Sequence, residues 1–192
     1  MLRALAVVGI VIAVVLGLAL AALVLLLATG TLKAYAIPSS AMEPTLHCAR
    51  PAPGCEAGTK DRVLALTRFV SYERGDLVVF EAPEEAERRC GAGGTFVKRI
   101  VGLPGEEVRI RLVEGRHHVY VDGAELAEPF IEDERRSSRS KKVGVFLGDE
   151  YFVLGDNRAQ SCDSGVWGPL PADHLKGKVV ATYWPSDRIT FR

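Results

Sequence analysis

The sequence predicts a mainly β fold, in which an N-terminal transmembrane helix is followed by an antiparallel β domain. Residues 4–29, ALAVVGIVIAVVLGLALAALVLLLAT, contain no charged side chain, and about 20 apolar residues suffice for a helix to span a bilayer. After residue 31, short apolar runs alternate with turn residues and no 3.6-residue periodicity is present. The sequence therefore divides into a transmembrane anchor, residues 1–30, and a β domain, residues 31–192.

The alternative for the apolar segment is a cleavable signal peptide. Such a peptide has an apolar region of about 7–15 residues, which is shorter than this run, although Ala34-Tyr35-Ala36 resembles a small-residue cleavage site. The length favours a retained single-pass helix in the lipid bilayer. The flanking positive charges, Arg3 and Lys33, are few, and they favour an N-terminus in the cytoplasm. The β domain is then expected on the extracytoplasmic side of the cell membrane.

The predicted strands follow one another closely, and turn residues separate them. They are expected within residues 62–70, 75–83, 95–105, 106–115, 117–126, 151–157 and 176–184. The two segments on either side of Gly115-Arg116 predict a β-hairpin. Two charged segments rich in glycine or serine, near 82–95 and 131–145, predict irregular insertions at the surface.

Charge and cysteine content limit the partners and the chemistry. The chain has 24 basic and 24 acidic side chains, so no basic field points to nucleic acid. Nothing in the sequence indicates an oligomeric state. An even number of cysteines in an exported domain allows two disulfides; the candidates are Cys48, Cys55, Cys90 and Cys162. The short loop between Cys48 and Cys55 favours that pair, and Cys162 is either bridged to Cys90 or free. No C-x-x-C pair is present, so no metal site is predicted.

Lys98 is the first candidate catalytic residue. On the strand predicted around it, Phe96, Lys98 and Ile100 share one face. A lysine among apolar side chains is costly unless it is neutral or paired. It is either an edge-strand lysine that extends its amine into solvent or a desolvated amine with a lowered pKa, able to act as a general base.

The densest polar segment is LGDNRAQSCDSGVWGPLP, residues 154–171. The Gly-Asp-Asn triplet alone indicates only a turn. Together with Arg158, Ser161 and Asp163 it predicts a set of groups that position a neutral lysine. No histidine is a comparable candidate, because none has a visible acid partner; His117, His118 and His174 are expected at the surface.

Taken together, these segments resemble the type I signal peptidases, a family of membrane-anchored Ser–Lys endopeptidases. IPSSAMEPTL, residues 37–46, resembles the nucleophile segment Pro-Ser-x-Ser-Met-x-Pro-Thr-Leu. RGDLVVF resembles the next strand, FVKRIVGLPGE the segment with the base, and LGDNRAQSCDS the final polar motif. The four matches occur in the family's order, across residues 35–185. The resemblance implies a signal-peptidase-type β domain that binds preprotein signal peptides as an added strand and that needs neither metal nor organic cofactor.

The resemblance also assigns roles to individual residues. Lys98 matches the general base. The hydroxyl of Ser39 and the backbone N–H of Ala41 match the oxyanion hole, and Ser161 matches the serine that orients the lysine. The matching supporting polar residues are Asp156, Arg158 and Asp163, and the matching structural residues are Met42 and Pro44.

Two positions depart from the family pattern. Gly165 stands where an arginine is common, and Ala41 stands at the position of the nucleophilic serine. A methyl group cannot attack a carbonyl. The chain is therefore an engineered variant, a natural pseudoenzyme, or an enzyme whose nucleophile is Ser40. Neighbouring side chains on an extended strand face opposite ways, so the last explanation requires a bulge or turn at Ser40–Ala41.

These observations leave several functions open. The first is an endopeptidase that removes signal peptides, disabled at Ala41 or using Ser40. The alternative is an inactive membrane-tethered module that binds extended segments resembling signal peptides without cutting them. A third is an anchored, disulfide-stabilised domain with an unrelated partner.

Overall fold

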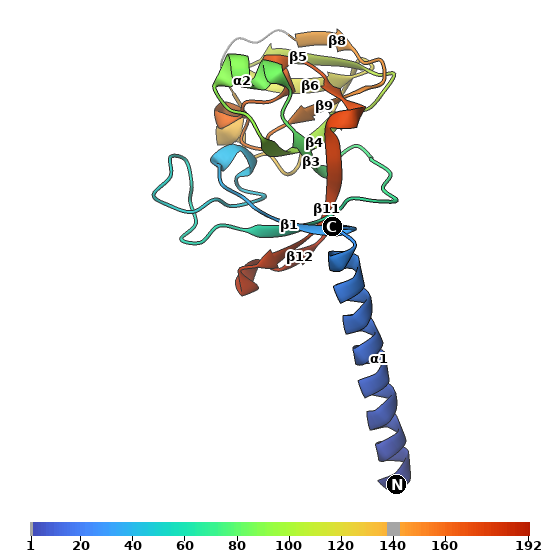
Figure 1. The fold of residues 1–192 in the computed structure, drawn as a ribbon. Helices are drawn as coiled ribbons and strands as arrows, with labels where there is room; N and C mark the ends of the chain where they lie inside the picture. Colours follow the sequence, from blue (N-terminus) through green and yellow to red (C-terminus); the bar gives the residue numbers. More distant parts are fainter. Residues whose placement is uncertain (1, 138–142) are drawn as a thin grey trace.

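A computed structural model describes residues 2–137 and 143–192. Helix α1 (Leu2–Ala28) stands apart from the β domain (Figure 1). Its segment Val7–Ala28 is long and apolar enough to cross a membrane, with a mean hydropathy of 3.3, and none of it is buried against the rest of the protein. Among the described residues this is the one helix of that kind. The expected arrangement of an N-terminal apolar helix and a mainly antiparallel β domain is confirmed.

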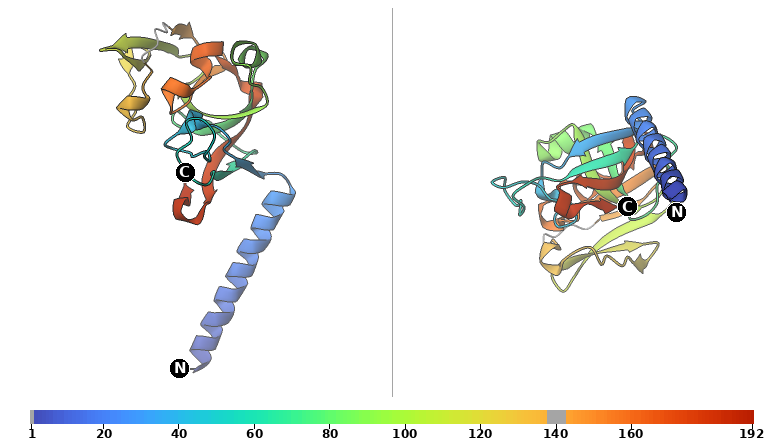
Figure 2. Two further views of the ribbon diagram at one scale, coloured as in Figure 1. Left: turned by 90° about the vertical axis from the view of Figure 1, so that its left-hand side faces the viewer. Right: turned by 90° about the horizontal axis from the view of Figure 1, so that it is seen from below.

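The larger sheet has the strand order β1-β2-β11-β3-β4-β9-β10, and β12 pairs with β11. Every pairing in it is antiparallel. The strands, in chain order, are β1 (Leu32–Ala36), β2 (Arg62–Leu66), β3 (Leu77–Glu81), β4 (Thr95–Gly102), β9 (Glu150–Leu154), β10 (Leu170–Pro171), β11 (Leu175–Trp184) and β12 (Thr190–Phe191). The sheet curves strongly, as the side view in Figure 2 shows.

The smaller sheet has the order β7-β6-β5-β8. Its strands are β5 (Glu107–Val113), β6 (Arg116–Val121), β7 (Ala124–Glu125) and β8 (Val143–Phe146). The predicted hairpin is formed by β5 and β6. Its turn residues Glu114 and Gly115 both have positive φ, 49° and 79°, as a two-residue turn of the I′ type requires.

Short helices occupy the connections between the strands. Helix α2 (Glu84–Cys90) lies in the segment near 82–95 that was expected to be irregular, and it ends at Gly91 with φ 64°. Glycine tolerates this left-handed conformation at a helix end. Helix α3 (Ser164–Trp167) lies in the polar motif, and 3₁₀ turns lie at Ser40–Met42, Asp133–Arg135, Arg158–Gln160, Ala172–His174 and Ser186–Arg188. Residues 138–142 of the other predicted insertion lie outside the described residues.

The hydrophobic core anchors the segment that resembles the nucleophile segment. Ile37, Met42 and Leu46 pack with the inner residues of β2, β3 and β11, and none of the three is more than 2% exposed. A second cluster joins the smaller sheet to β9, and a third surrounds Phe80 and Trp167. Residues 38–41 therefore lie between two points that are fixed in the core.

Candidate active site

A pocket of about 360 Å³ lies between the segment that follows β1 and the first half of β4. Strand β9 pairs with β4 only from Arg99 onward, so the edge of residues 95–98 is not covered by β9. The residues that line the pocket are Tyr35, Ala36, Ile37, Pro38, Ser39, Ala41, Met42, Ala92, Gly93, Thr95, Phe96, Val97, Lys98, Gln160 and Cys162. The predicted residues Ser39, Ala41 and Lys98 thus come together in one pocket, and Ser40 is absent from its lining.

The turn at Ser40–Met42 sends neighbouring side chains in different directions. Ala41 lines the pocket, whereas the buried hydroxyl of Ser40 donates to Gln160 Oε1 at 3.1 Å. Asn157 holds the turn from the same side. Its Nδ2 donates to the Ser40 carbonyl, and its backbone N–H donates to the Ala41 carbonyl, each at 3.1 Å. Asn157 and Gln160 were not among the predicted site residues; the Gly-Asp-Asn triplet was the only sequence signal for this contact.

The lysine of β4 is buried. Lys98 is 4% exposed, lies opposite Val78 of β3 in the sheet register, and has its Nζ 5.7 Å from the centroid of the Phe96 ring. Burial lowers the pKa of Lys98 from 10.5 to about 8, and the charges of Asp163 and Asp156 offset part of this effect. The sequence left open whether Lys98 extends its amine into solvent or buries it. The structure supports the buried, desolvated amine.

Asp156 joins the three segments that form the pocket. Its carboxylate accepts hydrogen bonds from Arg99 Nε at 2.9 Å and from Arg99 Nη2 at 2.6 Å. It also accepts one from Thr45 Oγ1 at 2.5 Å. Thr45 belongs to the nucleophile-like segment and Arg99 to β4, so one buried carboxylate fixes both relative to the polar motif. Arg99 and Thr45 were not predicted, because their shared partner lies more than 50 residues away along the chain.

Asp163 supports the pocket through backbone contacts and charge. Its Oδ2 accepts from the Gly155 N–H and its Oδ1 from the Gly165 N–H, each at 3.1 Å, the latter as the N-cap of α3. Its charge acts on Lys98, as described above. Of the residues matched to the supporting shell, Asp156 and Asp163 therefore both act on the lysine.

Arg158 contacts a different part of the protein. Its guanidinium forms a buried ion pair with Glu128, which follows β7, and its Nε donates to the Gly155 carbonyl at 2.9 Å. Glu128 also pairs with Arg136. Arg158 thus ties the polar motif to the segment beside the smaller sheet and does not line the pocket. Sequence reasoning missed Glu128, which stands in a segment without a motif.

His117 is buried, at 5% exposure, so the expectation that it lies on the surface was wrong. Alternation along β6 places residue 117 on the same inward face as Val119 and Val121. With Arg158, Asp163 and Gly165, it lines a small cavity of about 20 Å³. Gly165, the position at which the resemblance implies an arginine, is thus one of the residues that line this cavity.

Ser161 and Gly155 pack closely behind the turn. The Ser161 hydroxyl is buried and has no hydrogen-bond partner among the residues that the structure describes. A Cβ added at Gly155 would lie 2.2 Å from Ser161 Oγ and 2.5 Å from the Ala41 carbonyl oxygen. The Ala41 backbone, Gly155 and Ser161 therefore meet in a space that admits no further atom.

We expect Gly155→Ala to destabilise the protein and to displace the backbone of residue 41. Overpacking of this kind costs about 1–3 kcal/mol, and the atoms it meets include backbone, which cannot rotate away. The measurement is the unfolding midpoint of the protein in detergent. Gly148→Ala is the matched control, because a Cβ there meets nothing within 4 Å; equal midpoints for the two variants would contradict the prediction.

Both disulfides border the site. Cys48 pairs with Cys55, and Cys90 pairs with Cys162. Cys162 lines the pocket, and Cys90 ends α2 directly before the pocket residues Ala92 and Gly93. The second disulfide therefore fixes one wall of the pocket.

No group of metal-ligating side chains was found in residues 2–137 and 143–192.

Comparison with known proteins agrees with the motifs. The family model described as signal peptidase, peptidase S26, matches residues 8–184. A probable signal peptidase I-2 of Synechocystis sp. is 37% identical over 160 residues, covering 80% of this chain and 63% of that protein. The signal peptidase I of Bacillus licheniformis is 31% identical over 179 residues, covering 87% and 84%.

A third relative, the thylakoidal processing peptidase 1, chloroplastic, of Arabidopsis thaliana, is 34% identical over 164 residues, covering 80% of this chain. The chain spans 63% of the length of the Synechocystis relative and 42% of that of the Arabidopsis relative. The resemblance inferred from the four ordered motifs is confirmed, and the chain belongs to the signal peptidase family, peptidase S26.

Proposed function

We propose that this protein is a membrane-anchored endopeptidase of the signal peptidase I type whose attacking oxygen is missing at residue 41. The observation that supports this most strongly is the shared pocket of Ser39, Ala41 and Lys98. The lysine has a pKa of about 8, so near neutral pH a usable fraction is unprotonated and can accept a proton. These observations support Lys98 as the base of this pocket, and a methyl group then occupies the position that we assign to the nucleophile.

With a serine at position 41, the chemistry would follow the Ser–Lys variant of serine catalysis. The hydroxyl would transfer its proton to neutral Lys98 while its oxygen attacks the scissile carbonyl. The residue-41 N–H and the Ser39 hydroxyl would stabilise the oxyanion, and one such donor is worth about 10²–10³ in rate. Protonated Lys98 would then protonate the leaving amine, and water would hydrolyse the acyl-enzyme.

The Ser40 hydroxyl is a poorer candidate for the nucleophile. It donates to Gln160 Oε1, and Ser40 does not line the pocket of Lys98. Attack from Ser40 would require the 40–42 turn to rotate, and Asn157 holds the carbonyls of Ser40 and Ala41 in that turn. These contacts favour residue 41 as the position of the attacking atom.

The substrate we propose is the cleavage region of an exported preprotein. The pocket-side edge of residues 95–98 is left free by β9, so an extended peptide can add to it as a strand. Helix α1 would anchor the chain in the membrane with the β domain on the extracytoplasmic side. A binding module without catalysis is the second candidate, and Ala41 is the observation that favours it.

We expect the chain as given to bind a signal peptide with an Ala-x-Ala junction and to leave it intact. Fluorescence anisotropy in detergent measures the affinity, with the same peptide carrying Phe at both alanine positions as the control. Because the pocket is lined mainly by small and apolar groups, the control should bind at least about tenfold more weakly, the effect of about 1.4 kcal/mol. Equal binding of the two peptides would contradict the proposed substrate.

A further inference from the structure

Glu43 lies two residues after position 41, and its side chain is completely buried. The family pattern given for this segment specifies no residue at this position, and Glu43 does not line the pocket. A buried carboxylate is costly unless donors surround it. The contacts that offset the cost of burying the Glu43 carboxylate therefore show which parts of the chain hold it in position.

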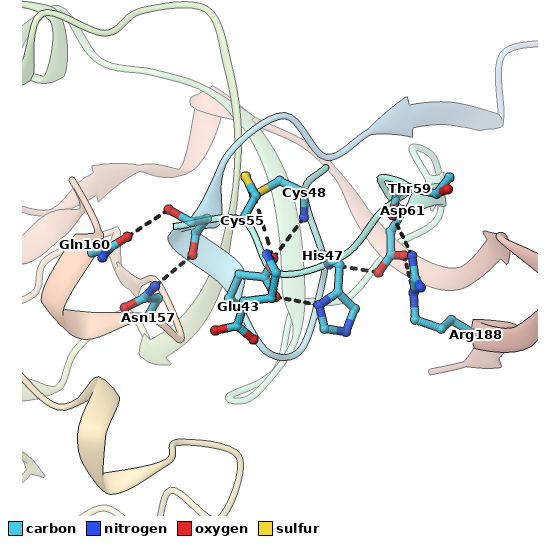
Figure 3. The surroundings of a disulfide bond; sticks show 11 residues. Glu43, His47, Cys48, Cys55, Thr59, Asp61, Asn157, Gln160 and Arg188 are labelled. Carbon is cyan, nitrogen blue, oxygen red and sulfur yellow. Dashed lines mark hydrogen bonds and ion pairs between the residues drawn. A yellow bond between two sulfur atoms is a disulfide. The ribbon is translucent and has the colours of Figure 1, made fainter. Parts of the chain in front are cut away.

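The neighbouring disulfide loop and the residues on either side of it contact this carboxylate (Figure 3). His47 Nδ1 lies 2.5 Å from Glu43 Oε2. The backbone N–H of Cys48 donates to Oε1 at 3.1 Å, and that of Glu56 donates to Oε1 at 3.4 Å. Cys48 begins the loop that the Cys48–Cys55 disulfide closes, and Glu56 directly follows its other end. The disulfide thus keeps two donors on one oxygen.

The same loop also touches the turn on its other side. A Cβ at Gly54 would lie 2.7 Å from Ser40 Oγ and 2.1 Å from Gln160 Oε1. The loop therefore contacts Ser40 before position 41 and Glu43 after it. Inside the turn, the Glu43 N–H donates to the Ser40 carbonyl at 3.1 Å, and the Leu46 N–H donates to the Met42 carbonyl at 2.9 Å.

We propose that Glu43 is a positioning residue, and that with the disulfide loop it holds residue 41 at its place beside Lys98. This proposal rests on the proposed function, since it concerns the same site. Glu43 acts through the backbone and does not touch the substrate. A displacement of about 1 Å at a reacting atom can cost about 10²-fold in rate, so loss of this support changes kcat while the peptide-binding wall, formed by β4 and residues 92–93, stays in place.

The kinetic test uses the full chain with Ala41→Ser as the parent. We expect Glu43→Ala to lower kcat by about 10–100-fold and to change KM by less than about threefold. Glu43→Gln should recover most of the activity, because its amide oxygen still accepts the two backbone N–H groups. Glu43→Leu fills the same space without accepting a hydrogen bond, and it replaces Glu43→Ala if that variant does not fold.

A double-mutant cycle tests the link to the disulfide. Replacing Cys48 and Cys55 together by alanine should lower kcat as Glu43→Ala does, and combining the changes should add little, since residues of one network are non-additive. Additive losses would overturn the link. Glu106→Ala is the matched control: its carboxylate accepts hydrogen bonds from the Arg74 side chain and from the backbone N–H of Leu103, and it should leave kcat unchanged.

Hydrogen exchange tests the positioning without cleavage. In the chain as given, the amides of residues 43 and 46 report the hydrogen bonds of the turn. We expect both Glu43→Leu and the disulfide-free variant to exchange there at least about tenfold faster, a loss of about 1.4 kcal/mol of local protection. Unchanged exchange would overturn the proposal. If Ala41→Ser does not cleave, the proposed function fails, and exchange still decides the role of Glu43.

Discussion

Ala41→Ser is expected to give this chain a cleavage activity on preproteins with an Ala-x-Ala junction that the chain as given lacks. The reason is the shared pocket, which residue 41 and Lys98 both line. Removing the nucleophile of an unrelated serine protease costs about 10⁶ in kcat, so restoring it can produce a gain of several orders of magnitude. The measurement is product formation by gel or mass spectrometry, with enzyme in detergent.

Ser40→Ala provides the control for this experiment. In the Ala41→Ser background it removes only the hydroxyl that donates to Gln160, so a large part of the activity should remain. Cleavage by the chain as given, abolished by Ser40→Ala, would show that the nucleophile is Ser40 and that the roles assigned to the turn are wrong.

Activity of the Ala41→Ser variant is expected to depend on unprotonated Lys98. Because burial lowers the pKa of this lysine to about 8, the protonated form predominates below pH 8 and cannot act as a base. kcat/KM should therefore rise about tenfold per pH unit below that value and level off above it. Initial rates between pH 6 and about 9.5 measure the profile; a rate independent of pH would contradict the role of Lys98.

Lys98→Ala in the same background should lower kcat by at least about 10²–10⁴, the usual contribution of a general base. Lys60→Ala is the matched control, since Lys60 is exposed at the surface. Peptide affinity should change much less than kcat in Lys98→Ala. A parallel loss of both would assign Lys98 to substrate binding.

The local features of the fold could be predicted from the sequence. The two-residue period of strands placed Phe96, Lys98 and Ile100 on one face, and β4 has that arrangement with the lysine buried. The hairpin followed from a glycine between two strand-like segments. The short spacing between Cys48 and Cys55 favoured the pair that the structure contains. Each of these depends on residues that are close together in the chain.

Contacts between distant segments could not be predicted in the same way. Asp156 forms hydrogen bonds with Arg99 and Thr45, and Arg158 forms an ion pair with Glu128. These contacts join separate elements, and no local pattern in the sequence specifies how those elements pack. Burial of His117 depends on which face of β6 turns inward. Alternation shows which residues share a face of the strand. Which of the two faces is buried depends on the element that packs against the strand.

The most direct measurement of the central claim is the site of acylation. The chain as given and its Ala41→Ser variant are mixed with an Ala-x-Ala peptide ester, quenched in acid, and digested for mass spectrometry. The account predicts an acyl group on residue 41 of the variant and none on residues 39–41 of the chain as given. An acyl group on Ser39 or Ser40 of the chain as given would contradict it, because the attacking oxygen would then lie elsewhere in the turn.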